Sequence, residues 1–169
     1  MENERNVTPG TVLNTDQLLS QWQGHRTLTR RVIEAFPDDQ LFTYSIGGMR
    51  TFAELASELN SMGATGAHGV VTGEWVEMKD LAKDSGLNLN PATKEEILRI
   101  WDWSTDYINR IWPQVKAERF NERDKAYGMY EGQVWWLLFY FIDNEIHHRG
   151  QGYVYLRSLG IEPPPFWDR

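Results

Sequence analysis

The chain has 169 residues, 17 Lys and Arg against 24 Asp and Glu, and no cysteine, so its formal net charge is −7. This length predicts one domain over residues 1–169, and the lack of cysteine excludes disulfides, a thiol nucleophile and every cysteine-ligated metal site. A sequence pI near 5.1 argues against nucleic acid as a partner, because a phosphate-binding surface needs a basic stripe.

Hydrophobic patterning also limits where the protein works. The apolar run Val134–Ile142 has nine residues, fewer than the roughly 20 that a membrane-spanning helix needs. The N-terminal sequence MENERNVTPG carries acids and no apolar core, which is unlike a signal peptide. We therefore expect a cytoplasmic protein without a membrane partner.

The first half of the chain predicts two helices behind a polar N-terminal arm, residues 1–14. Apolar residues recur at helical spacing from Leu18 to Phe36, after capping residues at 14–16 and before Pro37. A second helix begins near Thr51, where Glu54 completes a capping-box pattern. The small residues between Gly63 and Gly73 weaken this helix or mark a close approach to a neighbour.

The second half predicts two more helices, separated by long polar connections. Asn90-Pro91 opens the third helix with proline at its first position, and Pro113 ends it. The connection 114–130 shows no period, and the last helix runs from Glu131 to Leu159, before Gly160 and a Pro-rich tail at 161–169. With no strand pattern in the chain, we predict an all-α four-helix bundle with long connections between its helices.

Polar residues on the inward faces are the candidates for chemistry. Asn144 and His148 are four residues apart, so they share a face of the last helix with Gln151 and Tyr155, and two such side chains can converge on one metal ion. Glu58 on the second helix faces either this interior or water. The alternative is that these residues carry no chemistry. Glu58 would then be solvated, and of His147 and His148 one would lie on the surface and one in the core.

Other residues on these helices carry weaker signals. His25 and His68 stand alone and indicate nothing, and Trp135 and Trp136 are most simply core aromatics. Gly150 in the middle of the last helix suggests a close helix–helix contact.

The C-terminal sequence resembles a known family. His147-His148-Arg149-Gly150-Gln151, followed by Tyr155-Leu156-Arg157, Leu159-Gly160 and Pro163-Pro164, is similar to the signature of the DinB/YfiT-like family, as is the second-helix pattern Arg50-Thr51-Phe52, Glu54-Leu55 and Leu59. The resemblance covers nearly the whole chain. It implies a down-up-up-down four-helix bundle that is often a homodimer, with a divalent metal, such as Ni, Zn or Fe, held by three histidines. Relatives of this kind include thiol-dependent enzymes such as bacillithiol S-transferases and mycothiol-dependent isomerases.

The implied metal ligands are substituted in this chain. The second-helix histidine of the family falls on Glu58 and the first histidine of the last helix on Asn144, so only His148 is retained. His147 matches the extra histidine of the family doublet and is a candidate support for His148. The resemblance thus implies Glu58, Asn144 and His148 as the metal set, with Glu58 and His148 as candidate catalytic residues and Gln151 and Tyr155 as candidate substrate-orienting groups.

Two hypotheses follow for this site. In the first, a retuned metal site supports a metal-dependent hydrolase or a thiol S-transferase-like enzyme, with an external low-molecular-weight thiol because the chain has no cysteine. In the second, the metal is lost and Asn144 bridges Glu58 and His148 in a buried hydrogen-bonded triad. The protein would then be a non-catalytic dimeric bundle that serves as a binding or stress-response module for a small-molecule ligand.

Overall fold

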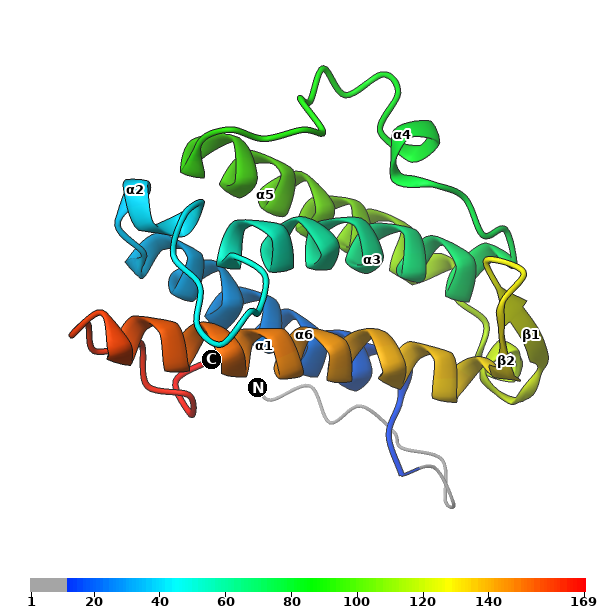
Figure 1. Cartoon of the computed structure of the whole chain (residues 1–169). Coiled ribbons are helices and arrows are strands. Elements are labelled where there is room, and N and C mark those ends of the chain that lie inside the picture. Colours follow the sequence, from blue (N-terminus) through cyan, green and yellow to red (C-terminus); the bar gives the residue numbers. More distant parts are fainter. Residues whose placement is uncertain (1–11) are drawn as a thin grey trace, which may run out of the picture.

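Four long helices dominate the structure, a computed structural model that describes residues 12–169 (Figure 1). They are α1 (Thr15–Ala35), α3 (Phe52–Thr72), α5 (Lys94–Ile111) and α6 (Val134–Ser158). As Figure 1 shows, α1 and α6 run in one direction and α3 and α5 in the opposite one, the down-up-up-down order. α3 packs against α5 and α6, and α1 packs against the same two helices. The predicted all-α four-helix bundle is confirmed.

Side-chain caps place the starts of the first two long helices where the sequence predicts them. Asn14 accepts from the Gln17 N–H at 2.8 Å, and the Gln17 side chain accepts in return from the Asn14 N–H at 3.0 Å. Thr51 and Glu54 form the same reciprocal capping box at the start of α3. Of the predicted N-terminal arm, residues 1–11 lie outside the described part of the chain.

The predicted start of the third long helix is wrong by three residues. α5 begins at Lys94, and its N-cap is Thr93, whose hydroxyl accepts from the Glu96 N–H at 3.2 Å. The Glu96 carboxylate reaches back to the Ala92 N–H at 2.7 Å. The first contact satisfies a free N–H group at the helix start and the second fixes the residue before the cap, so Pro91 is left outside the helix.

The connections contain short elements that the sequence analysis did not predict. Short helices α2 (Asp38–Leu41) and α4 (Met78–Leu81) follow α1 and α3, and two 3₁₀ turns, Trp112–Gln114 and Ala117–Asn121, follow α5. A hairpin of β1 (Arg123–Ala126) and β2 (Tyr130–Gln133) then pairs Arg123 with Gln133. The expectation of no strand was therefore wrong, and α6 begins at Val134 because residues 131–133 are extended in β2.

Small residues let α3 approach its neighbours closely. A Cβ on Gly66 would lie within 2.8 Å of the Phe141 ring, and a Cβ on Gly63 would lie 2.6 Å from an Arg26 nitrogen. On α6 the close approach is at Gly152, against the Phe52 ring. The predicted contact at Gly150 is wrong, because a Cβ there would meet nothing within 4 Å.

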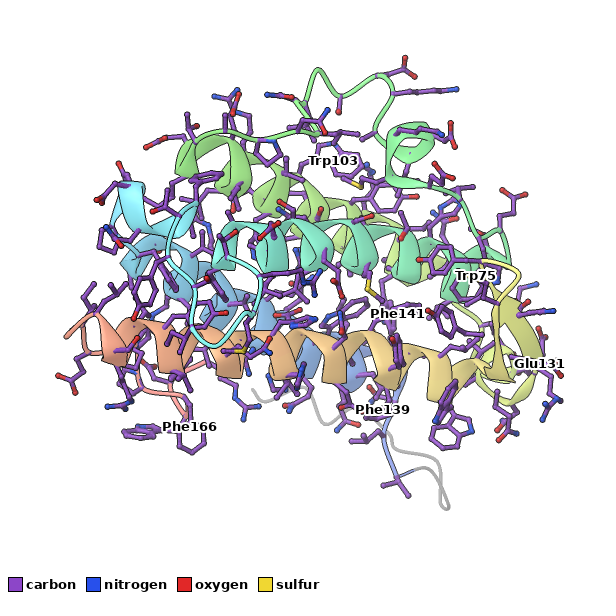
Figure 2. The ribbon with its side chains drawn as sticks, viewed as in Figure 1. Trp75, Trp103, Glu131, Phe139, Phe141 and Phe166 are labelled. Carbon is purple, nitrogen blue, oxygen red and sulfur yellow. The ribbon has the colours of Figure 1, made fainter. Side chains whose placement is uncertain are left out.

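The two faces of α6 differ in burial. Figure 2 shows Phe141 pointing from α6 toward α3 and Trp75, whereas Phe139 points away from them. Trp135 and Trp136 are 43% and 45% exposed, so the prediction that they are core aromatics is wrong. Tyr155, by contrast, is fully buried. The apolar surface of α6 therefore extends well beyond the part that the bundle covers.

The C-terminal tail, residues 161–169, returns across α6 and α1. Arg31 on α1 donates to the Asp168 carbonyl at 2.8 Å and to its carboxylate at 3.1 Å. Arg169 lies against Gly24: a Cβ atom added to Gly24 would be 3.3 Å from the Cβ atom of Arg169. Among the described residues, no helix combines the length and the apolar character needed to cross a bilayer.

Candidate functional site

The three residues that the resemblance singles out meet between α3 and α6. Glu58 projects from α3, and Asn144 and His148 lie one turn apart on α6. The Glu58 Oε1 atom lies 3.2 Å from both Asn144 Nδ2 and His148 Nε2. The three side chains do converge, but Glu58 is the bridge. Asn144 contacts Glu58 and the Met62 sulfur, and it does not link Glu58 to His148 as the triad hypothesis expected.

A fourth residue, Arg50, completes this site and was not predicted. Its Nη1 atom donates to Glu58 Oε2 at 2.6 Å, and the Tyr155 hydroxyl donates to the Arg50 carbonyl oxygen at 2.7 Å. Burial opposes ionisation of Glu58, but hydrogen bonds from Arg50 and Asn144 and the nearby His148 outweigh it and hold the pKa of that carboxyl below its ordinary value. We call Arg50, Glu58, Asn144 and His148 the outer cluster.

His148 contacts oxygen atoms on both sides of its ring. Its Nδ1 lies 2.7 Å from Gln151 Oε1, and its Nε2 faces Glu58. His147 is exposed, and its ring packs edge-on against that of His148, with centroids 5.0 Å apart. The doublet thus consists of one surface and one buried histidine, and the buried one is held by Gln151 as well as by the outer cluster.

The two candidate substrate-orienting groups have partners within the protein. The Gln151 amide lies between His148 and the Met49 sulfur, with Nε2 3.6 Å from Sδ. Tyr155 is fully buried and its hydroxyl is bonded to the backbone of Arg50. Their role toward a substrate stays a prediction, while their observed contacts position His148 and the start of α3.

Comparison with known proteins identifies the family. The model of the DinB family matches residues 11–168, nearly the full length of this sequence. The chain belongs to the DinB family. No match was found among curated protein sequences.

Solved DinB-like structures share the fold. A DinB-like protein from Bacillus subtilis superposes with a TM-score of 0.70 at 20% identity, covering 90% of this chain and 98% of that one. A DinB-like protein from Bacillus cereus gives 0.63 at 16% identity, over 89% and 95% of the two chains. A putative DinB family member from Exiguobacterium sibiricum gives 0.61 at 20% identity, again over 89% and 95%. At these identities the likeness concerns the fold.

The outer cluster of this DinB protein does not fit a divalent metal as its side chains stand. Metal ligation requires lone pairs that face a common point, but the Glu58 oxygens accept from Arg50 and Asn144, and the guanidinium would repel a dication. Within residues 12–169, moreover, no group of three or more His, Asp or Glu side chains could hold a metal ion. The amide of Asn144 is a poor substitute for the missing imidazole.

A second polar cluster lies on the other side of α6 in this DinB protein, and sequence reasoning missed it. Glu145 accepts from the Thr29 hydroxyl at 2.6 Å and lies 3.8 Å from the guanidinium nitrogens of both Arg26 and Arg149. Arg149 donates to Thr29 at 3.0 Å and lies 3.0 Å from His25 Nδ1. All five side chains are buried. We call Arg26, Thr29, Glu145, Arg149 and His25 the inner cluster.

Burial governs the charge states of the inner cluster. It raises the pKa of the Glu145 carboxyl, an effect that Arg26, Thr29 and Arg149 oppose. Burial, together with the positive charges of Arg149 and Arg169, lowers the pKa of His25 to about 4, so this ring is neutral at pH 7. The cluster therefore holds two guanidinium groups against at most one carboxylate, an excess of positive charge.

The sequence does contain a signal for the inner cluster. Arg26 and Thr29 fall at helical spacing between Trp22 and Ile33, in the middle of the apolar stripe of α1. Glu145 likewise follows Phe141 by four residues. A charged residue inside an apolar stripe indicates a buried, paired charge. The charged residues in the stripes of α1 and α6 would together have predicted that Arg26 and Glu145 pair.

Proposed function

We propose that this DinB-family protein works without a metal centre, as a small-molecule-binding bundle whose outer cluster is a hydrogen-bonded structural element. The observation that carries the proposal is that Glu58 is already surrounded, by the donors Arg50 and Asn144 and by the His148 ring. A metal ion would have to displace Arg50 and turn the Asn144 amide before it reached the carboxylate. Each displacement breaks a hydrogen bond to a charged group, which is worth about 1.5–3 kcal/mol.

The contacts of His148 also argue against metal-independent catalysis at this site. A general base needs a free lone pair within hydrogen-bond reach of the substrate proton. Both ring nitrogens of His148 contact protein oxygens, on Gln151 and on Glu58. His148 is therefore better suited to link α3 and α6 than to transfer a proton. This favours a binding function over a catalytic one.

A metal-dependent enzyme is the second candidate, and one observation favours it. The three positions that the resemblance implies as metal ligands do converge here, and the Arg50 side chain is 48% exposed, so water would offset part of the cost of moving it away. In that case Glu58 and His148 would be the principal ligands of a retuned site in a hydrolase or a thiol S-transferase-like enzyme.

Metal content and thermal stability separate these candidates. We expect the protein, purified without a His-tag or chelator, to contain no near-stoichiometric Ni, Zn or Fe and to show no thermal shift with Ni²⁺, Zn²⁺ or Fe²⁺. The double variant Arg50→Gln, Asn144→His removes the blocking cation and adds an imidazole, so it should gain a shift. Metal at 100 times its dissociation constant stabilises a folded protein by about 2.7 kcal/mol.

The matched control is Asn109→His on the exposed side of α5, which adds a surface histidine away from the site. It should not respond to metal. Near-stoichiometric metal in the unmodified protein, lost in both Glu58→Ala and His148→Ala, would overturn the proposal in favour of the enzyme. Thiol-transfer and hydrolysis assays would then be the next step.

A homodimer is part of this proposal. The first half of α6 exposes a set of aromatic side chains, each between 37% and 45% accessible: Trp135, Trp136, Phe139 and Tyr140. An apolar face of this kind on a soluble bundle supports self-association. A role as a stress-response module is proposed on the family resemblance.

A further inference from the structure

A cavity lies between the outer face of α6 and the C-terminal tail, away from the outer cluster. Its volume is about 370 Å³, and its lining includes Ile146, Gly150 and Tyr153 on α6 and the tail residues 162–167. Cavities of about 300–1,000 Å³ are typical of small-molecule sites. Figure 2 shows Phe166 on the side of α6 opposite α3, at the edge of the tail.

The charges at this cavity favour an anion. Arg149 and Arg157 line it and Glu162 is the acid among its lining residues. Arg149 belongs to the inner cluster, whose positive charge exceeds its negative charge. A chain with a net charge of −7 therefore presents a positive site here, and guanidinium groups match carboxylates in shape and charge.

The unpaired hydroxyl of Tyr153 also favours an anionic ligand. The Tyr153 oxygen is buried and has no hydrogen-bond partner among the described residues. Burial raises the pKa of this phenol, against the effect of Arg149, Arg31 and Arg157 around it, so it keeps its proton and can donate. Buried polar groups in folded proteins are nearly always paired. The hydroxyl is closed to water as the side chains stand, so a bound carboxylate would supply the missing acceptor after a small rotation of the Tyr153 ring.

The tail supplies the apolar part of the site. Three consecutive prolines line the cavity with Phe166 and Trp167, whose rings pack edge-on at 5.3 Å and are 61% and 73% exposed. Large exposed rings beside a cavity mark a place where a ligand removes apolar surface from water. Gly150 keeps the opposite wall open, since a Cβ there would meet nothing within 4 Å.

We propose that the cavity between α6 and the C-terminal tail binds a small aromatic carboxylate, with its charged end at Arg157 and the Tyr153 hydroxyl. This inference rests on the proposed function, because it supplies the ligand site of a binding module. It does not involve the outer cluster. The metal measurements above and the binding measurements below can therefore fail independently.

Calorimetric titration with 2-naphthoate, and with the neutral 2-naphthamide as the matched probe, tests the proposal. The full chain without a C-terminal tag should bind 2-naphthoate with 1:1 stoichiometry and at least tenfold more tightly than the amide. Arg157→Gln and Tyr153→Phe each remove one hydrogen bond to the carboxylate, so each should weaken binding about tenfold.

Gly150→Leu is the sharpest variant, because its side chain would fill the open space at the cavity wall. Binding should fall more than a hundredfold, while Val154→Leu, on an exposed position of the same helix, should bind like the unmodified protein. Circular dichroism confirms that both variants fold. Equal affinity for the acid and the amide, binding that survives Gly150→Leu, or no heat of binding up to the solubility limit would each overturn the proposal.

Discussion

The outer and inner clusters lie on different sides of the same helix, and they differ most in exposure. In the outer cluster the Glu58 and Arg50 side chains are 29% and 48% exposed. In the inner cluster the Glu145 and Arg26 side chains are 3% and 0% exposed. The outer cluster is thus partly open to water, whereas the inner cluster holds its charges in the closed space between α1 and α6.

This difference teaches that a buried polar group on a helix need not belong to the functional site. A buried ion pair contributes little net stability against an apolar replacement, but the loss of one partner is severe because the other stays buried and unpaired. An exposed pair loses little when it is broken. Substitutions in the two clusters should therefore differ in size, and three experiments test this expectation.

The largest effect should come from Glu145→Gln. This change keeps the shape of the side chain but leaves the guanidinium groups of Arg26 and Arg149 without a buried counter-charge, at a cost of about 3–5 kcal/mol. Urea unfolding followed by circular dichroism measures it. Glu131→Gln, in the exposed pair with Arg123, should cost less than about 0.5 kcal/mol. Equal losses in the two variants would remove the distinction between the clusters.

A smaller effect is expected from His148→Ala in the outer cluster. The truncation removes one partner from Glu58, which keeps Arg50 and Asn144. It also removes the only side-chain contact of the Gln151 amide oxygen among the described residues, so it should reduce the free energy of unfolding by about 1–3 kcal/mol. The matched variant His147→Ala, on the exposed neighbour, should change it by less than about 0.5 kcal/mol. If His148→Ala were as stable as His147→Ala, the hydrogen-bonded triad would have to be abandoned.

The smallest effect concerns pH and His25. The pKa of His25 is lowered from 6.5 to about 4 in the folded chain, so the unfolded chain binds the proton first as the pH falls. The stability contributed by the neutral ring is complete above pH 6.5 and is lost between pH 6.5 and pH 4. We expect a loss of about 1–2 kcal/mol, less than the full conversion, because water screens the arginine charges.

The difference between the unmodified protein and His25→Gln isolates this contribution, because other titrating groups are common to both. Urea unfolding at pH 7, 5.5 and 4 should show the unmodified protein losing stability relative to the variant as the pH falls. Parallel pH profiles would mean that His25 titrates alike in the folded and unfolded chain, and that the inner cluster does not keep it neutral.

Local signals explain which helix boundaries were predictable. The caps at Asn14 and Thr51 need only residues three positions away, so the pattern alone locates them. The start of α5 was misplaced because Pro91 and Thr93 both suit a helix start, and the reach of Glu96 back to Ala92 decides between them. The hairpin was missed because its charged, four-residue strands lack alternation and its turn places Tyr127 at a φ of 51°.

The candidate site was predictable in part. The family resemblance located Glu58, Asn144 and His148, because its motif is read along the chain. Arg50 was missed because its contact with Glu58 depends on how the backbone enters α3. Glu145 and Arg149 were missed because charged residues on helices usually face water. A single sequence also does not show which helix face packs against which other helix.

The contacts of α1 with α6 and with the C-terminal tail join segments that are synthesised at different times. Thr29 and Glu145 meet across 116 residues, and Arg31 meets Asp168 across 137. At roughly 5–20 residues per second, α1 leaves the ribosome on the order of ten seconds before its partners are made. Arg26 can meet Thr105 and the Trp101 carbonyl as soon as α5 is made. The part of α1 that faces Glu145, however, stays exposed until α6 emerges. The layer between α1 and α6 therefore closes only after α6, residues Val134–Ser158, has been synthesised.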